Sequence, residues 1–301
     1  MFDSDDPRSA LIAPSDAPPV GPPVAAECAV LADVEPQRGA GGPKSWYVRG
    51  NNFLTQYAEA RAGERIERAQ QVDEYMVLLP DPETVVRVDT ADGTQDVGGG
   101  TLLIVPPGYS RITALTPGPI TCFYSAASDD LLAMCSNADS YRSPRPTVAP
   151  FAPWPDPPDG FHLRTYSLDV PDQPGRFGRI WRCTTLMINV LPVQDGPRDP
   201  TKLSPHVHDD FEQGSIGLYG DFVHHLRWPW STDRTAWRDD EHLHCASPSI
   251  TVIPPTTIHT TEAVGSGAHQ LIDLFSPPRR DFSQRLGWVL NADEYPDQAV
   301  L

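Results

Sequence analysis

Apolar residues along this chain recur in short runs rather than with the period of a helix. The runs are rich in Val, Ile, Thr and aromatic residues, and clusters of Gly, Pro and Asp separate them. They cover residues 75–79, 84–88, 101–105, 120–124, 183–191, 215–219, 250–253 and 270–275. Only residues 131–138 offer a short helical candidate. Regularly spaced strands with so little helix predict an all-β sandwich or barrel.

The two halves of the chain also resemble each other. GTLLIVPPGYSRITAL (100–115) aligns without gaps on PSITVIPPTTIHTTEA (248–263), and ITCFYS (120–125) then matches LIDLFS (271–276). Each copy reads as a strand that ends in Pro-Pro, a turn and a further strand. Two matched segments in the same order predict a duplicated β-barrel.

Proline-rich stretches divide the chain into its expected units. Eight prolines lie in residues 1–44, which we expect to form a tail with one extra strand or helical turn near 28–34. The segment PRPTVAPFAPWPDPP (144–158) predicts an extended linker over 139–160. We therefore expect an N-terminal barrel at 45–138, a C-terminal barrel at 161–290 and a C-terminal tail at 291–301.

Composition narrows the possible partners and location. The chain of 301 residues has 23 Lys and Arg against 40 Asp and Glu, a net charge of −17, which disfavours nucleic acid and anionic membranes. No apolar run reaches membrane-spanning length, and the acidic N-terminus lacks the features of a signal peptide. Five cysteines without a CxxC pair do not suggest a disulfide framework. We expect a cytoplasmic protein that acts on a small molecule.

The chemistry-bearing residues gather in the second half, because all nine histidines lie at or after position 162. His206 and His208 alternate, so on a strand their rings would share one face. An oxygen donor follows at Glu212 or Gln213, and His259 comes after a Pro-Pro turn. Three imidazoles and one oxygen predict a site for one divalent transition metal: Fe, Mn, Ni or Zn.

This pattern resembles the cupin superfamily, whose motifs read G(x)5HxH(x)3,4E(x)6G and G(x)5PxGxxH. The resemblance covers roughly residues 45–130 and 165–285 and implies two tandem cupin (double-stranded β-helix, jelly-roll) barrels, a bicupin. Counting back from Gly220 favours Gln213 over Glu212 as the oxygen ligand. Thr256 and Pro248 replace glycines of the second motif, but His259 stands at its ligand position. The layout is similar to that of uronate-type sugar-acid isomerases.

The first barrel keeps the skeleton of the second motif without its ligands. Gly100, Pro106 and Gly108 are present, but Arg111 occupies the ligand position, and a guanidinium cannot bind a metal. We therefore expect a metal-free barrel that serves as a packing partner or an anion pocket.

Several further residues are candidates for catalysis. Alternation from Gln213 predicts that Tyr219 points inward, either to donate a hydrogen bond to substrate or to pack in the core. Of His224 and its neighbour at 225, at most one can face the interior, as a base or a hydrogen-bond donor. Glu212 is a candidate base if it is not a ligand. Asp273 interrupts an apolar strand and either faces solvent or lies inside the barrel as an acid or base.

An insertion between the two metal motifs carries aromatic and basic residues. Arg227, Trp228 and Trp230 could belong to a lid that binds an apolar or anionic substrate, or to a dimer contact. Because bicupins often pair, a homodimer is expected. The second HxH pair, His242 and His244, lacks the accompanying oxygen donor and closing glycine, so we do not assign it to the metal.

Three functions are compatible with these residues. The first is metal-dependent isomerase or lyase chemistry on a small oxygen-rich, keto- or uronate-like acid, in which the metal polarises a carbonyl. The second is a non-haem Fe(II) dioxygenase that cleaves an aromatic or diketone substrate, favoured if Glu212 is the ligand. The third is a small-molecule-binding barrel without catalysis, since fold alone does not fix chemistry.

Overall fold

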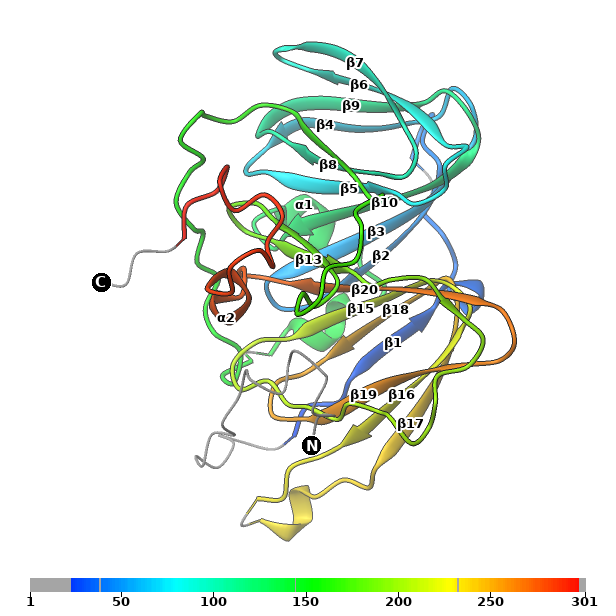
Figure 1. The fold of residues 1–301 in the computed structure, drawn as a ribbon, viewed down its shortest axis with the longest axis vertical. Coiled ribbons are helices and arrows are strands. Elements are labelled where there is room, and N and C mark those ends of the chain that lie inside the picture. Colours follow the sequence, from blue (N-terminus) through cyan, green and yellow to red (C-terminus); the bar gives the residue numbers. More distant parts are fainter. Residues whose placement is uncertain (1–22, 38, 144, 232, 298–301) are drawn as a thin grey trace.

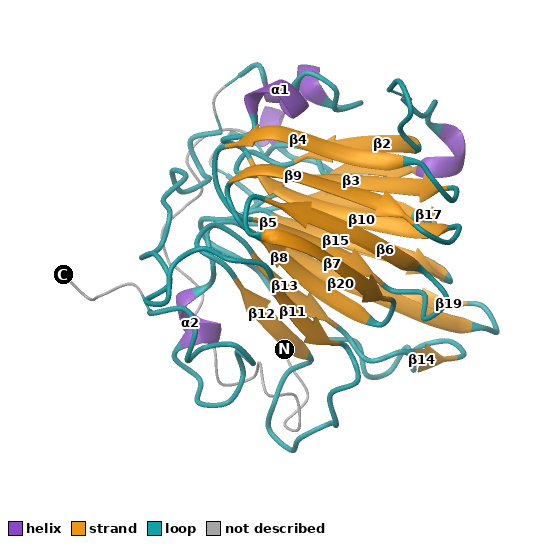
Figure 2. Cartoon of the chain, turned by 90° about the horizontal axis from the view of Figure 1, so that it is seen from above, coloured by secondary structure: helices purple, strands orange, loops and turns teal. Residues whose placement is uncertain are grey.

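The computed structural model describes residues 23–297 except 38, 144 and 232. Almost all regular structure within this part of the chain is β-strand (Figure 2). Its helices are single turns at the margins of the sheets: α1 (Asp129–Leu132), α2 (Arg280–Ser283) and the 3-10 turns Leu31–Asp33, Ala138–Tyr141 and Arg234–Ala236. The all-β prediction is confirmed.

Two large antiparallel sheets form the centre of the molecule. The first has the order β11 (Arg164–Ser167), β8 (Thr101–Val105), β5 (Tyr75–Leu79), β10 (Gly118–Ser125), β3 (Phe53–Ala60) and β2 (Lys44–Arg49). The second has the order β1 (Glu27–Val30), β18 (Ser249–Ile253), β15 (Gln213–Tyr219), β20 (Ala268–Phe275), β13 (Met187–Val190) and β12 (Arg179–Arg182), with β14 (Gln194–Asp195) also on β20.

Each large sheet is backed by a smaller one, which makes two barrels. The N-terminal barrel adds the sheet β4 (Arg65–Gln71), β9 (Gly108–Ala114), β6 (Val85–Thr90) and β7 (Gly93–Gly98). The C-terminal barrel adds β17 (Glu241–Ala246), β16 (Asp221–Arg227) and β19 (Ile258–Val264). Figure 1 shows the first barrel above the second. The fold is therefore two tandem cupin barrels.

The internal repeat identified in the sequence occupies equivalent strands of the two barrels. Strands β8, β9 and β10 hold the first copy, and β18, β19 and β20 hold the second. Even the turn between the first two strands is shared: Gly108 has a φ of +97° and its counterpart Thr256 has a φ of +65°. Since a residue with a Cβ rarely adopts this left-handed conformation, the turn geometry has persisted where the glycine has not.

Each barrel also receives a strand from outside its expected range. β1 lies within the predicted N-terminal tail yet pairs with β18 of the C-terminal barrel, where Figure 1 shows it in blue. For residues 28–34 we expected an extra strand or a helical turn, and the structure contains one of each: β1 and the 3-10 turn Leu31–Asp33. β11 lies within 161–290 yet pairs with β8 of the N-terminal barrel. The domain boundaries themselves stay a prediction.

The barrels differ in what fills them. One apolar cluster joins the facing sides of the two large sheets, with Trp46, Met76 and Phe123 from one and Trp181, Ile216 and Leu274 from the other. A second cluster, which includes Tyr75, Val77, Leu103 and Tyr124, fills the N-terminal barrel. Among the described residues, the C-terminal barrel has three smaller apolar clusters, around Phe275, Phe222 and Leu226. Its interior therefore has room for polar groups and a cavity.

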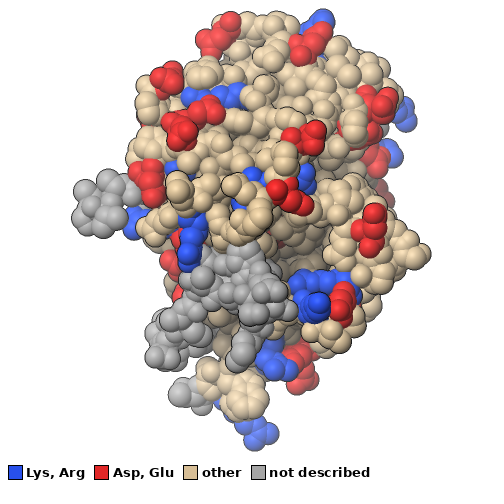
Figure 3. All heavy atoms as spheres, viewed as in Figure 1, with Lys and Arg blue, Asp and Glu red and all other residues tan. Residues whose placement is uncertain are grey.

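The described surface carries both signs of charge. Figure 3 shows acidic and basic side chains interspersed over one face rather than gathered into one basic patch. In the part of the chain that the structure describes, no helix has the length and apolar character needed to cross a bilayer.

Candidate metal centre

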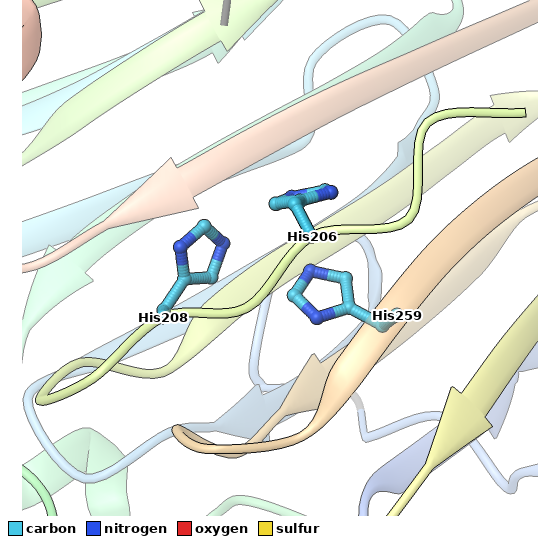
Figure 4. A group of neighbouring side chains, drawn as sticks. All are labelled: His206, His208 and His259. Carbon is cyan, nitrogen blue, oxygen red and sulfur yellow. The ribbon is translucent and has the colours of Figure 1, made fainter. Parts of the chain in front are cut away.

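Three imidazoles meet inside the C-terminal barrel (Figure 4). His206 and His208 lie in the segment before β15, whereas His259 lies on β19. One nitrogen from each ring lies within 4.8 Å of the others. Backbone bonds between His206 and His259, 2.9 Å and 2.8 Å long, bring the two segments together. The HxH pair is therefore placed by this single bridge, not by the regular strand that alternation suggested.

The outer ring nitrogens show which atoms are available as ligands. Nδ1 of His206 donates to the carbonyl of Ser204 (3.0 Å), and Nδ1 of His259 donates to that of Thr257 (2.9 Å). Because a carbonyl only accepts, both Nδ1 atoms carry the proton, which leaves Nε2 of each neutral ring with its lone pair. Histidine ligands are commonly oriented in this way, so the rings fit a divalent metal.

Gln213 supplies an oxygen to the same cluster. Its Oε1 lies 2.8 Å from Nε2 of His208 and 3.4 Å from Nε2 of His259. Its amide nitrogen donates to Asp273 Oδ1 (3.0 Å) and to Ser215 Oγ (3.1 Å). Since a carboxylate accepts only, Asp273 fixes the amide with its oxygen toward the imidazoles.

Glu212 points away from the imidazoles, as strand alternation requires for the neighbour of Gln213. Its buried carboxylate accepts from the backbone N–H of Asn51 (2.6 Å) and from the hydroxyl of Tyr141 (3.3 Å). Burial raises the pKa of Glu212. The side chain thus connects the C-terminal barrel to the turn between β2 and β3.

Glu74 makes the equivalent connection in the opposite direction. Glu74 precedes Tyr75 of β5, and Glu212 precedes Gln213 of β15. Because Tyr75 and Gln213 pair with equivalent positions of β8 and β18, the two glutamates occupy equivalent positions in the two barrels. Its carboxylate accepts from the backbone N–H (3.2 Å) and hydroxyl (3.1 Å) of Thr184, in the turn between β12 and β13. Each barrel therefore places one buried glutamate against a turn of the other, which accounts for Glu212 structurally.

A buried cation lies behind the third imidazole. Nη1 of Arg279 lies 3.5 Å from Nδ1 of His208, and the guanidinium also pairs with Asp281 and lies 4.0 Å from the ring centre of Phe282. Burial, and then the charge of Arg279, hold the pKa of His208 well below its usual range. His208 is therefore in the neutral form that metal binding by an imidazole requires. Arg279 carried no sequence signal, because nothing in its Pro-Pro-Arg-Arg run marks proximity to a distant histidine.

A cavity of about 420 Å³ adjoins the cluster. Its polar lining includes His206, Gln213, Asp273, Arg198, Thr261 and His269. Arg198 donates to the Thr261 carbonyl (2.9 Å) and to Ser204 Oγ (2.9 Å), so its charge is held at the wall. Of the two alternatives for Asp273, the structure places it inside, 6% exposed. Arg198 and His269 carried no sequence signal, since each lies in a segment without a motif.

Two predicted catalytic residues do not line this cavity. Tyr219 is 40% exposed, because a bulge between Gly217 and Tyr219 interrupts the alternation that would point it inward. His224 is the inward member of its pair, but it lies behind the wall, with Nδ1 2.9 Å from Thr261 Oγ1. Burial lowers the pKa of His224 to about 3, so it is neutral and a weak base at neutral pH.

The residues predicted to bind substrate also lie outside the lining. Arg227 pairs with Asp240 at 2.7 Å on the surface. Trp230 is 72% exposed and stacks on Trp237, with ring centres 4.4 Å apart. Trp228 is buried beneath Arg238. The aromatic residues of the insertion therefore contact one another and a neighbouring arginine rather than the cavity.

The N-terminal barrel has different groups at the equivalent positions. Arg111 aligns with His259 and pairs across β4 and β9 with Glu67, at a distance of 3.1 Å. Tyr75 stands where the second barrel has Gln213, and it stacks on Tyr124. An ion pair and packed tyrosines thus replace the imidazoles and the amide.

Solved structures show which known proteins this arrangement resembles. The oxalate decarboxylase of Lactobacillus farciminis in complex with formate matches with a TM-score of 0.56 and 15% identity, over 87% of this chain and 90% of that one. A variant of the Bacillus subtilis oxalate decarboxylase matches with a TM-score of 0.56 and 15% identity, over 85% and 78%. A further Bacillus subtilis structure, of an oxalate decarboxylase with Mn(II) centres, has a TM-score of 0.54.

These likenesses are structural only. No protein-family model matches the chain. No curated protein sequence matches it either. At 13–15% identity, the neighbours establish the two-barrel fold and leave the chemistry to be argued from the site.

Proposed function

We propose that this protein is a metal-dependent enzyme of the lyase type that acts on a small carboxylic acid inside the C-terminal barrel. The observation that carries the proposal is the convergence of His206, His208, His259 and the Gln213 oxygen beside a cavity that contains Arg198. The structural neighbours, which are oxalate decarboxylases, support the same class.

The four donors would hold one divalent transition metal. All of them are neutral, so a bound ion would keep its full charge and act as a Lewis acid toward a carboxylate or carbonyl oxygen. The Mn(II) centres of the Bacillus subtilis neighbour support manganese as the first metal to test.

The protein's own residues provide binding and orientation. Arg198 attracts an anionic substrate to the cavity, and its guanidinium is held in place by Thr261 and Ser204. Asp273 keeps the Gln213 oxygen directed at the metal position. The buried, neutral His224 holds the hydroxyl of Thr261 at the wall. Together these groups would orient the acid before any bond changes.

Isomerisation of a keto- or uronate-like acid is the second candidate. The neutral Gln213 donor favours it, because Lewis-acid polarisation of a carbonyl needs no change of oxidation state. The dioxygenase hypothesis would gain if Glu212 were the oxygen ligand, or if the tryptophan-rich insertion contacted the substrate. Glu212 faces Asn51, and the insertion lies outside the cavity lining, so no observation favours that reaction.

Metal analysis combined with activity tests the proposal. The protein should bind one equivalent of Mn(II) and convert a small carboxylic acid without consuming oxygen. Proton NMR and the release of CO2 would measure the conversion. His259→Ala should lose both metal and turnover. His244→Ala, at an exposed position of β17, should keep both. Absence of metal binding, or oxygen uptake in step with turnover, would contradict the proposal.

A further inference from the structure

Two cysteines from opposite ends of the chain meet where the two sheets of the C-terminal barrel come together. β1 is the edge strand of the large sheet, β17 is the edge strand of the small sheet, and the two strands contact each other. We call this line of contact the seam. Cys28 lies on β1 and Cys245 lies on β17. A covalent bond between them would join the two sheets along the seam.

Strand register shows that both side chains point into the space between the sheets. Cys28 stands opposite Thr251 of β18, which stands opposite Ser215 of β15. Residues directly opposite each other share a face of the sheet, and the Ser215 hydroxyl donates to Asp273 inside the barrel. Cys245 stands opposite Phe222, which lines the cavity. The two thiols therefore face each other from opposite sheets.

The thiols are in contact, and solvent reaches one of them. Sγ of Cys245 lies 3.6 Å from Oγ1 of Thr251, the residue that pairs with Cys28. A hydrogen bond also joins the side chains of Cys28 and Cys245. Cys28 is exposed, whereas Cys245 is only 1% exposed. A reagent dissolved in water therefore meets Cys28 first.

The environment also favours Cys28 as the reactive member. The hydrogen bond from Cys245 lowers the pKa of the Cys28 thiol to about 7, and the same bond, together with burial, raises the pKa of Cys245. The thiolate is the nucleophilic form of cysteine. Burial raises the pKa of Cys122 and of Cys135 to about 12, and it also raises that of Cys183. Cys28 is therefore the cysteine that most readily forms a thiolate.

We infer that Cys28 and Cys245 are a peroxide-reactive pair that hydrogen peroxide converts to a reversible disulfide. The Cys28 sulfur attacks one peroxide oxygen, the O–O bond breaks, and the hydroxide released takes up the proton that Cys28 gave up. The Cys245 sulfur then attacks the sulfenic acid of Cys28, the S–O bond breaks, and water leaves with the Cys245 proton. Two thiols and one peroxide thus yield one disulfide and two waters.

The disulfide would fix β1 to the barrel that contains the candidate metal centre. β1 is otherwise attached through its pairing with β18 and its contact with β17. Neither thiol lines the cavity, so the inference stands independently of the proposed function.

Mass spectrometry of the full chain tests the pair. Reduced protein would be treated with one equivalent of hydrogen peroxide, denatured with N-ethylmaleimide to block the remaining thiols, and digested without reductant. We expect a peptide that links Cys28 to Cys245, while the other three cysteines carry the maleimide. Dithiothreitol should restore both thiols.

Three variants separate the roles of the thiols. Cys28→Ser, at an exposed position, should remove the cross-link and leave Cys245 reduced. Cys245→Ala should leave Cys28 as a sulfenic acid that dimedone labels, because the thiol that condenses with it is gone. Cys135→Ala, in the apolar cluster of the N-terminal barrel, is the control and should cross-link as the wild type does.

The inference is overturned if peroxide leaves both thiols of the wild type reduced, or oxidises Cys28 to a sulfinic or sulfonic acid while Cys245 stays reduced. Reaction of another cysteine before this pair would overturn it as well.

Thermal melting tests the effect of the bond on the fold. Because a disulfide restricts the unfolded chain, oxidised wild type should melt about 5 °C above the reduced protein. Cys28→Ser should melt at the same temperature with and without peroxide. Cross-linked protein that melts no higher than the reduced protein would overturn the expectation that the bond fixes β1.

Discussion

The amide of Gln213 shows how one residue depends on another distant in sequence. A glutamine can present either its oxygen or its nitrogen, and only the oxygen can bind a metal. Asp273 and Ser215 accept or share the amide protons, which directs the oxygen to the imidazoles. Asp273 is thus a positioning residue rather than a ligand.

Replacing Asp273 tests this role directly. Asp273→Leu should free the amide to rotate and should weaken Mn(II) binding by about 10–100-fold, the usual effect of removing a partner that orients a ligand. Titration calorimetry with Mn(II) would measure it. Asp195→Leu, on the edge strand β14, is the control. Unchanged metal affinity in Asp273→Leu would show that the amide needs no such support.

Among the elements, β1 contributes to a barrel that is distant from it in the sequence. It lies in a proline-rich segment, yet it extends the seven-stranded sheet by pairing residues 27–30 with 249–252 of β18. Ala29 packs there, and Leu31 in the following turn is 2% exposed. The strand therefore covers an edge of the barrel that contains the candidate metal centre, an edge that would otherwise expose its backbone groups.

Trimming the chain measures what β1 contributes. A chain that begins at residue 31 loses the strand and its backbone pairs, and its melting temperature should fall by about 5–10 °C relative to the intact chain. A chain that begins at residue 23 retains β1 and should melt well above the chain that begins at residue 31. Differential scanning calorimetry would compare the three. Equal melting of both trimmed chains would show that β1 is dispensable.

In the whole molecule, the two barrels are joined by an apolar interface and by two buried glutamates, Glu74 and Glu212, each of which contacts a turn of the other barrel. Glu74 is fully buried and accepts hydrogen bonds from Thr184 and from the hydroxyl of Tyr295 (2.7 Å). Burial raises the pKa of Glu74, while these hydrogen bonds and Arg164 oppose the shift. The ionised form therefore lowers the stability of the fold relative to the neutral form.

The direction of that shift predicts a pH dependence. Because the pKa of Glu74 is higher in the folded than in the unfolded chain, its stabilising contribution is complete below the unfolded pKa and is lost as pH rises through the folded pKa. Glu74→Gln cannot titrate. The melting temperature of wild type relative to Glu74→Gln should therefore be lower at pH 8 than at pH 5.

Thermal melts of both proteins at the two pH values would measure this double difference. Glu59→Gln, at an exposed strand position, gives the baseline for removing one carboxylate. A difference that is equal at both pH values, or that moves in favour of wild type at pH 8, would contradict the assigned burial effect.

Local sequence patterns were enough to predict the duplicated all-β architecture and the residue types of the candidate metal centre. Strand alternation and the repeated Pro-Pro turn are local properties, so they can be recognised in the sequence without knowledge of the tertiary structure. The sequence repeat correctly predicted that β8, β9 and β10 are the equivalents of β18, β19 and β20 in the other barrel. His206, His208 and His259 were recognisable because their spacing follows a motif.

Which other side chains reach the site depends on long-range packing in the folded chain. Arg198, His269 and Arg279 are brought there by strand pairing between distant segments. A single bulge turns Tyr219 outward, and a contact with the opposite barrel, at Asn51, occupies Glu212. Such placements depend on long-range register and packing, which no short-range pattern encodes, because one residue of slip exchanges the two faces of a strand.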